Sequence, residues 1–246
     1  MFELQPWTAE HDALLAALPR DERTRIMRYR RTEDRCRALM AAILPRLAIG
    51  YRRDPPLGTI ILPRTAAGKP FYADDPGLCF NLSHSGNYVA LALGPAPVGV
   101  DIELIRAKRD SDAIAKRFFA TDEFRWLSRF GQPERAVRFY ELWSRKESVV
   151  KAAGDGLAGN LAGFSTVPGG DCESAVNVDG HRWWVRSFHE PTGYSLAVCT
   201  AAAGLPLRKP ILSRDGTKPS APRLADRACQ AVAELLDQAA PIERPS

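Results

Sequence analysis

The sequence has few cysteines, and no two of them lie close together. The five are Cys36, Cys79, Cys172, Cys199 and Cys229. An odd number at wide spacing argues against a disulfide framework, and also against a zinc site with closely spaced thiolates. The pattern is typical of a protein that works in a reducing compartment.

Long apolar runs are also missing. No segment approaches the roughly 20 consecutive apolar residues that a membrane-spanning helix requires. The first residues, Met1-Phe2-Glu3-Leu4, lack the basic-then-apolar order of a secretory signal peptide. We therefore expect a soluble, cytoplasmic protein without a membrane partner.

Neither sign of charge is in large excess, since the formal net charge of the 246 residues is +5. This mild excess suits a phosphorylated ligand or an acidic protein partner and does not require nucleic acid. A nucleic-acid-binding protein would interleave basic residues with exposed aromatic ones. Here eight arginines cluster between Arg20 and Arg37, whereas the aromatic-rich segment is Phe118–Phe130. We expect no nucleic-acid partner. Dense arginine favours phosphate, although most of these side chains could simply be solvated.

The most informative stretch is Val98-Gly99-Val100-Asp101-Ile102-Glu103. Its alternation predicts a half-buried strand. Asp101 and Glu103 lie two residues apart, so both carboxylates leave the same face. Two like charges on one face repel each other, and an oxygen-seeking cation such as Mg²⁺ between them would relieve this. The alternative is an exposed strand end with solvated acidic side chains.

A helix is predicted from Pro133 to a glycine stop at Gly154. Within it, Trp143, Glu147 and Lys151 recur every four residues and form one stripe. A glutamate followed by a lysine at this spacing is also a common surface pair. The stripe alone leaves both interpretations open.

Two polar segments precede the central strand. Gly68-Lys69-Pro70 is typical of a tight loop whose lysine could reach a phosphate. Ser83-His84-Ser85-Gly86-Asn87 is typical of a hairpin loop, which could serve only as a turn or could present a hydroxyl and an imidazole to a phosphate. The absence of a Gly-x-Ser-x-Gly sequence argues against a serine hydrolase.

The rest of the chain alternates between helical and strand-like segments. We expect strands at 2–7, 58–63, 78–82, 88–93, 161–166, 183–188 and 194–199, and helices at 9–18, 33–48, 108–119 and 121–130. The order of elements in the first half recurs after residue 103 without a letter-by-letter repeat. Four prolines within 205–223 predict a linker, and 224–239 predicts an amphipathic helix.

Four segments in this order resemble the Sfp-type 4′-phosphopantetheinyl transferases, over about residues 18 to 200. They are Gly68-Lys69-Pro70, Phe80-Asn81-Leu82-Ser83-His84-Ser85-Gly86, Val98-Gly99-Val100-Asp101-Ile102-Glu103 and Trp143-Ser144-Arg145-Lys146-Glu147-Ser148-Val149-Val150-Lys151. The resemblance implies an α+β fold, a pseudo-dimer of two similar α+β halves with the active site in the cleft between them. The halves would be residues 1–100 and 101–204, followed by a proline-rich linker and C-terminal helix at 205–246.

The resemblance also implies an activity. Enzymes of this holo-carrier-protein synthase type use Mg²⁺ to transfer the 4′-phosphopantetheine group of coenzyme A to a serine of an acyl, peptidyl or aryl carrier protein. Such carriers serve fatty acid, polyketide or nonribosomal peptide biosynthesis. We expect coenzyme A and a carrier protein as partners, and a monomer whose two halves form the pseudo-dimer. The basic patch would speed association with an acidic carrier, and the Phe118–Phe130 segment would offer it an apolar contact.

Individual residues receive roles from the same resemblance. The metal ligands would be Asp101, Glu103 and Glu147, and the catalytic residues would be Glu147 as the base and Lys151 facing the pyrophosphate. Coenzyme A would be bound by Arg25, Gly68, Lys69, Pro70, Asn81, Ser83, His84 and Lys151. Arg25 would face the 3′-phosphate. The family often has a second basic residue three positions earlier, but this chain has Glu22 there, so a neighbour such as Arg23 or Arg28 would take over that role. The intact acidic residues and lysine argue against a non-catalytic relative that only binds coenzyme A or a carrier.

Overall fold

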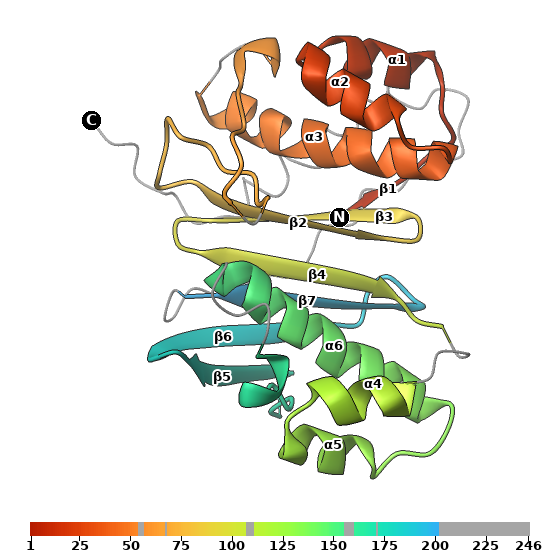
Figure 1. Cartoon of the computed structure of the whole chain (residues 1–246), viewed down its shortest axis with the longest axis vertical. Helices are drawn as coiled ribbons and strands as arrows, with labels where there is room; N and C mark the ends of the chain where they lie inside the picture. Colours follow the sequence, from red (N-terminus) through yellow and green to blue (C-terminus); the bar gives the residue numbers. More distant parts are fainter. Residues whose placement is uncertain (54–56, 67, 107–110, 155–159, 171, 202–246) are drawn as a thin grey trace. The chain divides into compact units, whose positions relative to one another are not determined.

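The computed structural model describes residues 1–53, 57–66, 68–106, 111–154, 160–170 and 172–201 (Figure 1). These residues combine helices with antiparallel sheet, so the expected α+β class is confirmed. They divide into two compact units. The first contains residues 1–62 and 87–91, and the second contains residues 63–86 and the described residues from 92 onward.

The first unit is mainly helical. Its elements are β1 (Phe2–Glu3), α1 (Ala9–Ala16), α2 (Arg20–Met27), α3 (Thr32–Arg53) and the short 3₁₀ turn η1 (Leu57–Thr59). Helices α1 and α2 pack on α3, whose apolar side chains Leu39, Ile43 and Leu47 are buried at helical spacing. Strand β1 pairs antiparallel with the start of β3 (Tyr88–Gly94).

The second unit is built on a four-stranded antiparallel sheet with the order β4-β7-β6-β5. Its strands are β4 (Val98–Leu104), β5 (Glu173–Val178), β6 (His181–Phe188) and β7 (Tyr194–Thr200). Asp101 of β4 lies opposite Ala197 of β7, which fixes the register at the predicted acidic strand. The unit also contains β2 (Cys79–Ser85), which runs beside β4.

Helix α6 (Glu134–Ala153) lies across this sheet and packs on β4, β7 and β6 (Figure 1). It is covered in turn by α4 (Ser111–Phe118) and α5 (Thr121–Leu127). Gly99 marks the closest approach of β4 to α6, because a Cβ there would lie 2.0 Å from the carbonyl oxygen of Ser148 and 2.5 Å from the backbone nitrogen of Ala152. Only glycine lets the two backbones come this close.

Most of the predicted elements are confirmed. The central strand 98–103 is β4, and the helix predicted from Pro133 ends, as expected, at Gly154 with a φ of +84°. The helices predicted at 9–18, 33–48 and 121–130 are α1, α3 and α5, and α4 covers the described part of 108–119. The strands predicted at 183–188 and 194–199 are β6 and β7.

Two strand predictions are wrong. The segments 58–63 and 161–166 form no strand and instead contain or adjoin the 3₁₀ turns η1 and η2 (Leu161–Gly163). Their backbone carbonyls are used by buried cations: Ile60 accepts a hydrogen bond from Arg46, and Phe164 accepts one from Lys146. The partners found for these two carbonyls are therefore buried side-chain cations, and apolar sequence patterning does not reveal such partners.

The predicted hairpin loop at 83–87 is also shorter than expected, because the residues Ser83 to Ser85 belong to β2 and only Gly86 and Asn87 turn. Strand β5 was not predicted. The linker and helix predicted within 205–246 lie outside the described residues. Among the described residues, no helix combines the length and apolar character needed to cross a membrane.

Candidate functional site

Three polar side chains from the predicted segments contact one another: Ser83 of β2, Asp101 of β4 and Lys151 of α6. The ammonium nitrogen of Lys151 lies 2.6 Å from Oδ1 of Asp101 and 3.0 Å from Oγ of Ser83. The hydroxyl of Ser83 donates a hydrogen bond of 2.9 Å to the same carboxylate oxygen. The sequence prediction that these residues share one site is thus consistent with the geometry of the second unit.

Asp101 is buried, and its second oxygen, Oδ2, has no hydrogen-bond partner in the described part of the chain. Burial raises the pKa of Asp101, and the opposing effects of Lys151, Ser83 and His84 only reduce that shift. A buried carboxylate oxygen without a donor is costly, and it is the position at which a cation would be stabilised.

Glu147 is half-buried on α6, and its carboxylate is under the influence of the two acidic residues of β4. Burial raises the pKa of Glu147 most, the charge of Asp101 raises it further, Lys151 lowers it, and Glu103 again raises it. The negative charges of Asp101 and Glu103 therefore disfavour ionisation of Glu147, and a cation beside these groups would offset this effect.

Carboxylate oxygens are the kind of donor that Mg²⁺ takes. Among the described residues, however, no three acidic, histidine or cysteine side chains converge closely enough to enclose an ion by themselves. Mg²⁺ prefers hard oxygen donors and is usually bound by one or two carboxylates, with waters and substrate phosphates completing the shell. Oδ2 of Asp101, which accepts no hydrogen bond from the described residues, could serve as one such oxygen ligand.

The Gly68-Lys69-Pro70 segment forms the predicted tight turn, and Gly68 has a φ of +83° that favours glycine. The ammonium of Lys69 points into the protein. It donates to the carbonyl of Lys151 over 2.6 Å and to that of Val98 over 3.4 Å. A cation at these carbonyls also complements the negative end of α6, so Lys69 links the loop to the helix and strand that carry the site.

Asn81 and His84 lie on opposite faces of β2. The Oδ1 atom of Asn81 is buried and accepts a hydrogen bond of 2.9 Å from the backbone N–H of Val100. His84 is exposed. Asn81 thus connects β2 to β4 by a buried hydrogen bond, whereas His84 is accessible to a ligand.

Arg25 lies in the first unit, where it lines a hollow of about 590 Å³ together with Arg20, Asp21, Thr24 and Arg28. Glu22, the departure from the family pattern, is engaged in structure: both of its oxygens accept hydrogen bonds from the guanidinium of the buried Arg46. Its carboxylate also lies 3.8 Å from Arg25. Of the two candidates to replace it at a phosphate, Arg28 lines the hollow beside Arg25.

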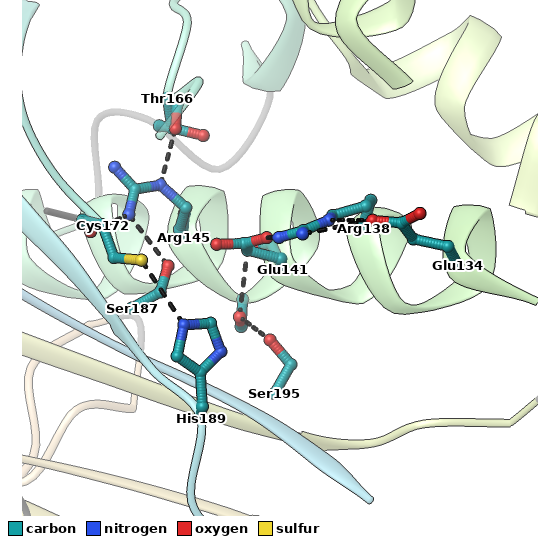
Figure 2. Close-up of polar contacts among 10 residues, drawn as sticks. Glu134, Arg138, Glu141, Arg145, Thr166, Cys172, Ser187, His189 and Ser195 are labelled. Carbon is teal, nitrogen blue, oxygen red and sulfur yellow. Dashed lines mark hydrogen bonds and ion pairs between the residues drawn. The ribbon is translucent and has the colours of Figure 1, made fainter. Parts of the chain in front are cut away.

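The residues of α6 just before Glu147 have a different role. Arg145 is fully buried, and its guanidinium donates to the carbonyls of Thr166 and Cys172 over 2.6 and 2.8 Å and to the hydroxyl of Ser187 over 2.9 Å (Figure 2). Burial lowers the pKa of Arg145 to about 10, so it remains charged at neutral pH. It fastens α6 to the strands and loops beneath it.

Lys146 and Glu123 form a buried ion pair. Both side chains are fully buried, and the ammonium nitrogen lies 2.6 Å from a carboxylate oxygen. Lys146 also donates to the carbonyl of Phe164. The Oε1 atom of Glu123 accepts from the backbone and hydroxyl of Thr166, and its Oε2 accepts from the backbone of Ala120. Every charged atom of this pair has partners.

Comparison with known proteins identifies the family. Residues 97–199 match the 4′-phosphopantetheinyl transferase superfamily, and residues 3–96 match the 4′-phosphopantetheinyl transferase, N-terminal family. A 4′-phosphopantetheinyl transferase of Bacillus subtilis is 35% identical over 196 residues, which cover 78% of this chain and 86% of the relative. The 4′-phosphopantetheinyl transferase Sfp of Bacillus subtilis strain 168 is 33% identical and covers 80% and 88%. The 4′-phosphopantetheinyl transferase HetI of Nostoc sp. is 31% identical and covers 72% and 84%.

The chain belongs to the 4′-phosphopantetheinyl transferase superfamily. The predicted resemblance and enzyme class are therefore confirmed. Every side chain of the cluster around Asp101 that comes from β4 or α6 falls in the matched segment 97–199, and Lys69 and Ser83 fall in the matched segment 3–96. The assignment of individual roles and the domain boundaries at residues 100 and 204 stay predictions, as does a site located in a cleft between the halves.

Sequence reasoning missed Ser85, a polar residue of β2 that contacts this candidate site. The hydroxyl of Ser85 donates a hydrogen bond of 3.1 Å to Oε2 of Glu103. A signal for it was present: Ser83 and Ser85 have the same two-residue spacing as Asp101 and Glu103, so two neighbouring strands would bring the pairs together.

Proposed function

We propose that this transferase uses Mg²⁺ to move the 4′-phosphopantetheine group of coenzyme A onto a serine hydroxyl of an acyl, peptidyl or aryl carrier protein. The observation that carries the proposal is the arrangement around Asp101. One oxygen of this buried carboxylate is held by Lys151 and Ser83, and the other accepts no hydrogen bond from the described residues. The charge of Asp101 also acts on Glu147 of the helix.

The metal ligands in this proposal are Asp101, Glu103 and Glu147. When bound, Mg²⁺ would supply positive charge to neutralise the pyrophosphate and the leaving phosphate. The effect of Asp101 and Glu103 on Glu147 supports this assignment, because a divalent cation would offset the repulsion of the Glu147 carboxylate by the other two.

Lys151 would bind the pyrophosphate. An ammonium group has three N–H donors, and Asp101 and Ser83 accept from it in the described structure. These two acceptors fix the direction of the side chain, so that a further N–H can face a phosphate oxygen. Held in this way, the charge needs no reorganisation when negative charge develops on the leaving group.

Glu147 would act as the general base. The oxygen of the carrier serine would attack the β-phosphorus of coenzyme A and form the new P–O bond. Its proton would pass to Glu147, and the bond to the adenosine 3′,5′-bisphosphate leaving group would break. A raised pKa favours a carboxylate as proton acceptor near neutral pH, because the driving force for proton transfer increases.

Coenzyme A would extend from this centre along the loops. The Gly68-Lys69-Pro70 backbone would line the adenosine end, and Ser83 and His84 would hold phosphate with Asn81 behind them. Arg25 would face the 3′-phosphate, and Arg28 would take the place left by Glu22, which is supported by their shared hollow. We also propose a cytoplasmic monomer, with carriers of fatty acid, polyketide or nonribosomal peptide synthesis as partners.

The test is transfer to a carrier. The protein is incubated with coenzyme A, Mg²⁺ and an apo carrier protein, and the intact carrier is weighed. A mass gain of one phosphopantetheine group is expected. It should disappear with Lys151→Met and persist with Lys116→Met, a control lysine on the exposed side of α4. Absence of any mass gain with acyl, peptidyl and aryl carriers would overturn the proposal.

A further inference from the structure

Strands β2 and β4 run side by side in the same direction and are joined by side chains of β2. Three oxygen atoms at alternate positions of β2 accept hydrogen bonds from alternate backbone N–H groups of β4. Asn81 accepts from Val100 over 2.9 Å, Ser83 from Ile102 over 3.3 Å, and Ser85 from Leu104 over 3.0 Å. Each bond spans the same sequence distance, so the three form a regular ladder.

Two of these three positions make a second contact with a carboxylate. Ser83 donates to Oδ1 of Asp101 over 2.9 Å, and Ser85 donates to Oε2 of Glu103 over 3.1 Å. At the third position the corresponding residue of β4 is Gly99, which has no side chain. The second contact therefore occurs only where β4 carries an acidic residue.

From this geometry we propose that Ser85 is a positioning residue for the divalent cation, which it affects by holding the carboxylate of Glu103. The inference rests on the proposed function, in which Glu103 is a metal ligand. It adds a residue that has no role in that proposal.

The chemistry of the hydroxyl group explains how Ser85 would do this. A serine hydroxyl has one donor and two acceptor lone pairs. The N–H of Leu104 occupies an acceptor position, which restricts rotation of the hydroxyl and leaves its hydrogen directed at Glu103. Carboxylate ligands of metals are commonly held by such a second hydrogen bond, and its removal weakens metal affinity about 10- to 100-fold.

The experiment measures Mn²⁺ binding, as a paramagnetic substitute for Mg²⁺, by the loss of the free-ion electron paramagnetic resonance signal in the presence of coenzyme A. Ser85→Ala should bind Mn²⁺ about 10- to 100-fold more weakly than the wild type. Ser85→Thr, which keeps the hydroxyl, should retain the wild-type affinity.

Thermal unfolding separates positioning from a merely structural role. Asn81→Ala removes an acceptor from another N–H of β4 where no carboxylate is attached, so it shows what the loss of one ladder position costs in melting temperature. If Ser85→Ala lowers the melting temperature to a similar extent but binds Mn²⁺ as tightly as the wild type, the inference is wrong. If the wild type itself binds no Mn²⁺, the metal assignment in the proposed function fails, and the inference fails with it.

Discussion

Lys146 and Glu147 are neighbours on α6, yet they belong to two charged clusters of opposite character. The cluster around Lys146, which we call the anchor, contains Glu123 and Lys146, and all of its charged atoms have partners. The cluster around Glu147, which we call the site, contains Asp101, Glu103, Glu147 and Lys151. There one buried oxygen has no hydrogen-bond partner among the described residues, and two carboxyl groups, those of Asp101 and Glu147, have raised pKa values.

The difference shows what each cluster contributes. Removing one member of a complete buried pair leaves the other charge uncompensated, so the anchor should contribute to stability. The site has more negative charge than its one lysine can compensate, so removing a carboxylate should relieve repulsion. Perturbed carboxyl groups of this kind gather where proteins bind ligands or perform chemistry. Helix α6 thus carries one charged residue that stabilises the fold, Lys146, and one whose charge is repelled by neighbouring carboxylates, Glu147.

The largest expected effect comes from breaking the anchor. Glu123→Gln leaves Lys146 fully buried without an opposite charge and should lower the free energy of unfolding by about 3–5 kcal/mol. Urea unfolding followed by circular dichroism measures this loss. Glu134→Gln, which removes an exposed partner of Arg138 on the same helix, is the control and should change it by less than about 1 kcal/mol. Equal effects of the two substitutions would show that the buried pair contributes no more to stability than an exposed ion pair on the same helix.

A second test separates the strand of the site from its helix. In Gly99→Ala the added methyl group would overlap the backbone of α6 and should cost about 1–3 kcal/mol, together with most of the transfer activity. Gly94→Ala is the matched control, since a Cβ there has its nearest neighbour at 3.7 Å. Denaturation and carrier-modification rates measure both effects. Full activity of Gly99→Ala would contradict the close approach of β4 and α6.

A third and smaller effect has the opposite sign. Glu147→Gln should increase the free energy of unfolding of the metal-free protein by about 0.5–2 kcal/mol. The substitution removes a half-buried negative charge that Asp101 and Glu103 repel. Transfer activity should be lost in the same variant. Denaturation in the presence of a chelator, alongside the mass assay, measures the two quantities. If Glu147→Gln were less stable than the wild type, Glu147 would contribute to stability, as the anchor residues do, and the explanation by charge repulsion would be wrong.

The smallest expected effect is the pH dependence of the stability that Glu147→Gln adds. Because the pKa of Glu147 is raised in the folded protein, the folded state holds more protons than the unfolded state between the ordinary value of 4.5 and the raised value. This carboxyl group therefore costs stability progressively as the pH rises through that interval. The stability difference between Glu147→Gln and the wild type should be small below pH 4.5 and grow above it. Melting temperatures across a pH series would measure it, and a difference independent of pH would refute this explanation.

The sequence predicted the parts of this molecule whose signal is local. The alternation in Val98–Glu103 gave β4 with two carboxylates on one face, and the run from Pro133 to Gly154 gave α6. The resemblance gave the family. The same local signals failed for 58–63 and 161–166, since apolar β-prone residues cannot reveal that a distant Arg46 or Lys146 uses their carbonyls.

The polar residues on β2 were misjudged for a related reason. Serine and histidine beside glycine are typical of turns, but Ser83 and Ser85 lie in a strand because β4 offers N–H groups and carboxylates to their hydroxyls. Arg145 and Lys146 belong to the motif that carries Glu147, yet both have structural partners: Lys146 is part of the anchor, and Arg145 donates to the backbone carbonyl of Thr166. Which charge in a motif is structural depends on burial, and burial is set by the whole fold.

The most direct test of the difference between anchor and site is the change in melting temperature when Mg²⁺ and coenzyme A are added to the wild type, Glu123→Gln and Glu147→Gln. A ligand that binds only the folded state raises its stability according to its affinity. We predict stabilisation of the wild type and, from a lower starting value, of Glu123→Gln. Glu147→Gln should start higher and show little response to Mg²⁺. Equal stabilisation of Glu147→Gln and the wild type by Mg²⁺, or a lower starting value for Glu147→Gln, would contradict the division of α6 into an anchor and a metal site.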